Sequence, residues 1–134
     1  MKAAELQALF RGGRRDFANT NLDGEDLSGF ELHKIDLRWG KLVRSNLTQA
    51  LLCRANLSGA DLTGAVLTGA DLHRANLRQA RLCNADLRAA DLREADLRGA
   101  DLTRANLIGA KMTGALLQGA ITTKALIWQP HDSA

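Results

Sequence analysis

The sequence predicts an all-β fold of the solenoid type, in which short extended segments wind around a narrow apolar interior. The first observation is a period of five: from Phe17 to Leu117 every fifth residue is leucine, apart from Phe17 itself and Met112. The second is that alanine lies two residues before this central residue in every repeat from Ala50 onwards. The third is an aromatic content of only 4% with no tyrosine, so the core must consist of small and medium aliphatic side chains.

A period of five excludes the regular elements. On an α-helix five residues rotate by about 500°, which would scatter the leucines around the axis. On one continuous strand an odd period would send successive leucines to opposite faces. A short extended segment followed by a corner satisfies the pattern, because alanine and leucine then point inward in every unit. The residue before leucine and the residue after it point outward, and the fifth residue turns the chain.

The outward residue before leucine carries turn chemistry. It is Asp, Asn or Glu in 15 of 21 repeats, and these side chains bond nearby backbone amides in tight turns. Glycine recurs at the fifth position, where it tolerates unusual backbone dihedral angles. Stacked coils of such units would pair their backbones at the spacing of about 4.8 Å between β-strands.

Individual units carry a family resemblance. Residues 60–64 read Ala-Asp-Leu-Thr-Gly and residues 105–109 read Ala-Asn-Leu-Ile-Gly, which resembles the pentapeptide-repeat consensus Ala-(Asp/Asn)-Leu-X-X. The resemblance covers residues 15–124. It implies a right-handed quadrilateral parallel β-helix with four repeats per coil, so that residues 20 apart in sequence stack. Phe30, Ile35 and Gly40 replace the usual alanine, and we expect them to widen or distort the first coils.

The two ends depart from the repeat. Residues 1–14 are predicted to form the N-terminal cap and the entry to the repeat, with a short helix over residues 2–10 that Gly12 and Gly13 end. A cap is needed because an uncapped solenoid exposes its core and backbone. Residues 125–134 are predicted to form a C-terminal cap or tail. Alternatively, the apolar C-terminal end is a homodimer contact, as in some relatives. The residues of this candidate contact are Leu116, Ile121, Leu126, Ile127 and Trp128.

The sequence offers no catalytic site. No nucleophile, base and orienting group can be identified, and the many carboxylates are explained by the turn position. If residues 20 apart stack, His33, Cys53 and His73 form a column, but parallel side chains about 5 Å apart converge poorly on a tetrahedral zinc ion. We therefore predict no enzyme activity, no metal and no cofactor. Cys53 and Cys83 would lie on different sides, so we expect no disulfide between them and a reducing, cytoplasmic setting.

Binding of another protein is the predicted function. The candidate surface combines the outward residues Trp39 and Val43, because exposed tryptophan beside arginine is typical of binding hot spots, with neighbouring and stacked cations. Those cations are Arg38, Arg44, Lys34, Arg54 and Arg74. Alternatively, Trp39 packs against the N-terminal helix.

Two other functions remain as alternatives. Some pentapeptide-repeat proteins, including quinolone-resistance proteins, bind DNA gyrase as acidic mimics of the duplex, so the resemblance admits a topoisomerase modulator. Weak nucleic-acid binding through the stacked cations Lys34, Arg54 and Arg74 is the second. The formal net charge of +3 and the alternation of Asp and Arg along the repeats disfavour both, because mimicry needs a sustained negative surface and stacking on bases needs exposed aromatics. No apolar run approaches the length of a membrane span.

Overall fold

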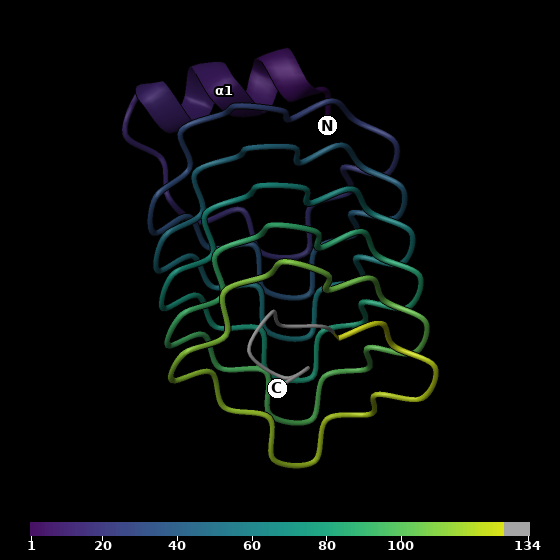
Figure 1. The fold of residues 1–134 in the computed structure, drawn as a ribbon. Helices are drawn as coiled ribbons and strands as arrows, with labels where there is room; N and C mark the ends of the chain where they lie inside the picture. The colour runs from purple at the N-terminus through teal and green to yellow at the C-terminus, as the bar shows by residue number, and fades with distance from the viewer. Residues whose placement is uncertain (128–134) are drawn as a thin grey trace.

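The chain folds into a stack of coils with one helix lying across the first coil (Figure 1). The computed structural model describes residues 1–127. The helix, α1 (Ala3–Arg11), comes first, and the chain then descends coil by coil toward the C-terminus. Within residues 1–127 no helix has the length and apolar character needed to cross a membrane.

The coils contain 20 residues each, which is four repeats. Every backbone bridge is parallel and joins residues 20 apart, from Asp16 with Asp36 at the start to Asn106 with Leu126 at the end. Each bridge is a single isolated residue pair, so the extended segments are too short to form regular strands among the described residues. The stacking of residues 20 apart that the family resemblance implies is confirmed, and the ladder continues as far as Leu126.

In the central coils, three backbone N–H groups per repeat donate hydrogen bonds to the neighbouring coils. In the repeat of Leu47, the N–H of Leu47 donates to Val66 O (2.6 Å), the N–H of Gln49 donates to Thr68 O (2.9 Å), and the N–H of Asn46 donates to Glu25 O (2.9 Å). A fourth bond closes the turn, from the N–H of Ala50 to Leu47 O (3.0 Å). Backbone groups in the interior therefore have partners despite the absence of long strands.

The core is the column of leucines and alanines that the period predicts. Leucine is buried at every central position from Leu22 to Leu107, and alanine is buried from Ala50 to Ala110. The side chain before leucine faces outward and accepts the N–H two residues later, as Asn46 Oδ1 does from Thr48 (3.0 Å). Although Ile35 is larger than alanine, it is fully buried, and the bridges keep their 20-residue register through the first coils.

The helix is attached by residues that replace alanine in the first coil. At the N-terminus of α1, the N–H of Ala3 donates to Oε1 of Glu25 (2.7 Å). At the other end, Nη1 of Arg15 donates to Phe10 O (2.8 Å) and Arg14 O (3.1 Å). Glu25 and Arg15 both occupy the position that holds alanine in the later repeats. An anion at the helix N-terminus and a cation at its C-terminus also match the helix dipole.

Every turn places its fifth residue at positive φ, whether or not that residue is glycine. Nine repeats have glycine there, but Ala89 (φ 58°) and Trp39 (φ 56°) adopt the same left-handed conformation. For a residue with a Cβ atom and no side-chain hydrogen bond, this region costs about 1–2 kcal/mol.

We expect Ala89→Gly to raise the free energy of unfolding by about 0.5–1 kcal/mol, because glycine relieves the left-handed strain but loses more chain entropy on folding. Urea denaturation followed by circular dichroism measures the change. The neighbouring Ala90→Gly is the control: Ala90 is fully buried and not at positive φ, so it should lower stability. A loss of stability in Ala89→Gly would contradict the strain argument.

Candidate functional site

Trp39 is exposed, and its ring lies on the surface of the neighbouring coil. Its side chain is 59% exposed, and its ring lies against Gly59, the equivalent residue of the next coil. A Cβ atom on Gly59 would lie 2.4 Å from two carbons of the ring, so only glycine permits this arrangement. This contact is with the coil that lies one step further from the helix.

The direction of the Trp39 ring is shared by other long side chains at the fifth position. Several of them extend toward the next coil and lie over a glycine there. Arg44 lies over Gly64, and Gln49 over Gly69, with each Cγ atom 3.3 Å from the place of a glycine Cβ. A glycine 20 residues later therefore provides the space that a long side chain needs.

The Trp39 surface surrounds an open hollow of about 500 Å³. We give this name to the residues that line it: Asp23, Trp39, Gly40, Lys41, Val43, Gly59, Asp61, Gln79 and Arg81. Asp23 Oδ1 accepts the N–H of Val43 (2.8 Å), and Asp61 Oδ1 accepts the hydroxyl of Thr63 (2.6 Å). Lys41 and Arg81 form no ion pair within residues 1–127, so two cations are available beside an aromatic ring.

The structure brings together only part of the predicted surface. Trp39 and Val43 line the same hollow, whereas Lys34, Arg54 and Arg74 belong to a different column of turns. Arg38 is paired with Asp36, with 2.9 Å between Nε and Oδ1. Sequence reasoning missed Lys41, Gly59 and Arg81, although their spacing of 20 from Asp61 and Trp39 could have identified them.

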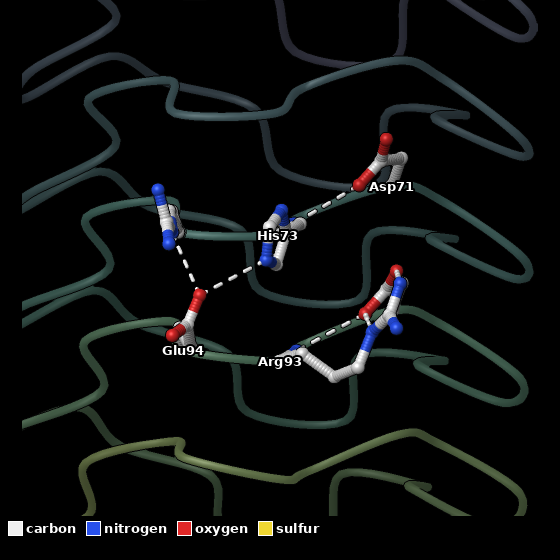
Figure 2. Close-up of polar contacts among 6 residues, drawn as sticks. Asp71, His73, Arg93 and Glu94 are labelled. Carbon is white, nitrogen blue, oxygen red and sulfur yellow. Dashed lines mark hydrogen bonds and ion pairs between the residues drawn. The ribbon is translucent and has the colours of Figure 1, made fainter.

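Arg74 is engaged within the solenoid. Figure 2 shows Glu94 extending from its own coil toward His73 on the adjacent coil. Oε2 of Glu94 lies 2.7 Å from Nε of Arg74 and 3.1 Å from Nε2 of His73. The hydrogen bond and the charge of Arg74 lower the pKa of Glu94. Arg74 is therefore less available to a partner than we expected.

Three arginines in successive repeats each form a bidentate ion pair with the aspartate two residues earlier, using the same edge of the guanidinium. In Arg88, Arg93 and Arg98, Nε donates to Oδ1 (2.8–2.9 Å) and Nη2 donates to Oδ2 (2.7 Å). Their partners are Asp86, Asp91 and Asp96. Hydrogen bonding to the arginine lowers the pKa of each aspartate. These pairs neutralise much of the acidic surface of the later coils.

The His33, Cys53 and His73 column shows no metal-binding geometry. No cluster of three or more His, Cys, Asp or Glu side chains suited to a metal ion occurs within the described part of the chain. Cys53 and Cys83 are both free thiols. Burial, together with hydrogen bonding to Asp101, raises the pKa of Cys83, which makes it a poor nucleophile at neutral pH.

The last coil exposes apolar side chains. Leu116, Ile121, Leu126 and Ile127 are all 39–53% exposed. Leu116, Ile121 and Leu126 occupy the outward position that holds Asp or Asn in most repeats. Trp128, the remaining residue of the predicted C-terminal contact, lies outside the described residues.

These features define a parallel solenoid of 20-residue coils with an exposed tryptophan beside two cationic side chains. The family model for pentapeptide repeats matches residues 31–69, 45–88 and 80–119, with 8 copies. The chain therefore belongs to the pentapeptide-repeat family. Comparison with curated proteins found no significant match.

Solved structures of other pentapeptide repeat proteins are similar along most of their length. A protein of the cyanobacterium Cyanothece 51142 is 26% identical with a TM-score of 0.54, covering 94% of this chain and 99% of that one. A protein of Nostoc Pcc 7120 is 32% identical with a TM-score of 0.55, covering 87% and 96%. A protein of the Arabidopsis thaliana thylakoid lumen is 29% identical with a TM-score of 0.50, covering 94% and 75%.

We expect Gly59→Ala to displace the Trp39 ring, because the new Cβ would overlap it. Gly64→Ala is the matched control: both glycines have nearly the same φ (67° and 68°), but Gly64 faces the flexible Arg44 side chain. Both substitutions should lower the free energy of unfolding by about 1 kcal/mol through backbone strain. Only Gly59→Ala should shift the Trp39 fluorescence, measured in a Trp128→Phe background. Equal spectra for the two variants would contradict the packing of Trp39 on Gly59.

Proposed function

We propose that this protein is a non-enzymatic scaffold that binds another protein through the Trp39 surface. The observation that carries the proposal is an exposed tryptophan whose ring packs directly on Gly59 of the next coil. Tryptophan is enriched at binding hot spots. A ring that is already positioned also loses little conformational freedom when the partner arrives, which favours affinity.

The chemistry of the hollow indicates the kind of segment that it would bind. Trp39 and Val43 offer apolar contact, and the cations Lys41 and Arg81, which form no ion pair within residues 1–127, line the same hollow. Asp23 uses one carboxylate oxygen to accept the N–H of Val43 in the next coil, and Asp61 uses one to accept the hydroxyl of Thr63. We infer that the partner presents an apolar side chain flanked by a carboxylate.

The scaffold that we infer is the right-handed, four-sided solenoid of the family resemblance. The support for this is a 20-residue coil in which positive φ recurs every fifth residue, giving four turns per coil. Two free cysteines support a reducing, cytoplasmic setting.

Of the alternatives, topoisomerase binding by duplex mimicry is less favoured. Asp36, Asp86, Asp91 and Asp96 are each within 2.9 Å of an arginine nitrogen, so the acidic surface is interrupted by neutralising cations. A duplex presents about one negative charge per 1.7 Å of axis. No inhibition of gyrase supercoiling is therefore expected from the purified protein.

The exposed end of the solenoid supports a second contact, with another copy of the chain. The apolar residues Leu116, Ile121 and Leu126 are a suitable surface for it, since exposed apolar patches mark association sites. We propose an end-to-end homodimer, and analytical ultracentrifugation of the parent and Ile121→Glu tests it. A monomeric parent at high concentration would contradict the proposal.

The test of the Trp39 surface compares three forms of the protein. Affinity capture from host lysate with the parent, Trp39→Ala and Ile108→Ala would identify a partner, and titration of the purified partner would measure its affinity. Ile108 is also an exposed apolar residue, at 41%, but it does not line the hollow. We expect Trp39→Ala to weaken binding by about 30-fold, the scale of a hot-spot residue, and Ile108→Ala to have no effect. A partner bound equally by all three would exclude the Trp39 surface.

A further inference from the structure

A second hollow lies between α1 and the first coils, and it does not share residues with the Trp39 surface. Its volume is about 280 Å³, and its lining residues are Gln7, Phe10, Arg11, Arg15, Glu31 and His33. Two guanidinium groups and one carboxylate therefore line the same hollow. Neither Arg11, Arg15 nor Glu31 forms an ion pair within residues 1–127.

Arg15 is held in a defined orientation. Its guanidinium carbon lies 3.9 Å from the centre of the Phe10 ring. Its Nη1 donates to two backbone carbonyls, Phe10 O (2.8 Å) and Arg14 O (3.1 Å). Stacking and these two bonds restrict a side chain that would otherwise lose much rotamer freedom on binding a ligand.

The remaining edge of Arg15, formed by Nε and Nη2, has no hydrogen-bond partner within the described residues. Arg88, Arg93 and Arg98 each use this same edge to donate two hydrogen bonds to an aspartate elsewhere in the protein. Two parallel N–H groups match the two oxygens of a carboxylate or phosphate. In Arg15 this edge is unused, although the side chain lines a hollow large enough for a small ligand group.

We propose that this hollow binds an oxyanion, with Arg15 as the bidentate ligand and Arg11 as a second cation. The shared chemistry is that of a carboxylate or a phosphate, carried by a small solute or by a side chain. Arg11 is in the last turn of α1, and its guanidinium adds a second positive charge to the lining of the hollow. Glu31 opposes the bound anion, so its removal should strengthen binding.

The neighbouring Arg14 provides an internal contrast. Its guanidinium carbon lies 4.5 Å from the centre of the Phe17 ring, and its Nε donates to Asp16 O (2.8 Å). The Nε–Nη2 edge of Arg14 is therefore already occupied in part, and Arg14 does not line the hollow. Two adjacent arginines thus carry the same charge but differ in their availability for a bidentate contact.

The experiment titrates the full chain with sodium acetate and, separately, with inorganic phosphate at low ionic strength. The side-chain Nε–H signals of the arginines are followed by nuclear magnetic resonance. We expect saturable shifts at Arg15 in the parent. Arg15→Lys should weaken binding about ten-fold, because lysine keeps the charge but lacks the two parallel N–H groups of the guanidinium edge. Arg14→Lys, which makes the same change of residue type, should leave the affinity unchanged.

Glu31→Gln is a second variant that does not depend on the helix attachment made by Arg15, and it should bind the anion more tightly than the parent. Tighter binding of acetate than of phosphate would assign the site to carboxylates, and the reverse would assign it to phosphates. Three results would overturn the proposal: no saturable shift at Arg15 with either anion, equal weakening by Arg14→Lys and Arg15→Lys, or no gain in affinity in Glu31→Gln.

Discussion

Replacing Leu72 with alanine is expected to lower the free energy of unfolding by about 2–5 kcal/mol, the range for removing a fully buried leucine without collapse of the cavity. Leu72 is 0% exposed. Its backbone is bonded to the next coil, since its N–H donates to Asp91 O (2.8 Å). Because those hydrogen bonds hold the coils in register, the interior cannot easily move inward to fill the lost volume.

The position of Leu72 in the stack adds to this effect. In a solenoid each coil contacts only its neighbours, so a defect in a central coil weakens the coupling between the two halves. Leu117→Ala is the matched control, because Leu117 is also a central leucine but is 37% exposed in the last coil. We expect Leu117→Ala to cost less than about 1 kcal/mol. Urea denaturation followed by circular dichroism measures both variants, and equal losses would contradict the argument.

The inward residues could be predicted because the period of five leaves only one arrangement in which every leucine faces the same interior. Leu72 and Ala75 follow directly from that pattern, and both are buried. The number of repeats per coil could not be predicted from the period, because the period defines the repeating unit and not the number of units in one coil. That number came from the family resemblance, and the parallel bridges between residues 20 apart agree with it.

The candidate sites were only partly predictable, because they depend on departures from the repeat. Trp39 was selected from the sequence, but the position of its ring depends on the missing Cβ of Gly59. Arg15 and Glu25 replace alanine in the first coil, and the sequence did not reveal that they hold opposite ends of α1. A repeat predicts what its members share, whereas these contacts are made by single residues that break it.

Acid is expected to destabilise the solenoid strongly below about pH 4. The pKa of each of Asp86, Asp91 and Asp96 is lowered in the folded state by hydrogen bonding to its arginine. A carboxyl group whose pKa is lower when folded stabilises the protein above the unfolded pKa of about 3.9, and this stability is lost as the pH falls through the folded pKa. The contribution of these three aspartates to the free energy of unfolding should therefore change little between pH 7 and pH 5.

Repulsion makes the loss larger than the paired aspartates alone would produce. Protonation of the 15 acidic residues leaves the charges of 18 Lys and Arg and 3 His unopposed. The coils bring these charges within one Debye length, which is about 10 Å at 0.1 M salt, because neighbouring coils are about 4.8 Å apart. Added salt should therefore restore part of the stability at pH 3, as measured by thermal unfolding.

A triple variant separates the two causes of acid unfolding. Replacing Arg88, Arg93 and Arg98 with glutamine removes three cations together with their aspartate pairs. The matched control replaces Arg44, Arg54 and Arg104 with glutamine, which removes the same total charge. These three arginines form no ion pair within residues 1–127. If pairing matters, the pH dependence of unfolding should be shallower in the first variant than in the control. Identical pH profiles would show that general repulsion, and not the arginine–aspartate pairs, determines the acid sensitivity of the solenoid.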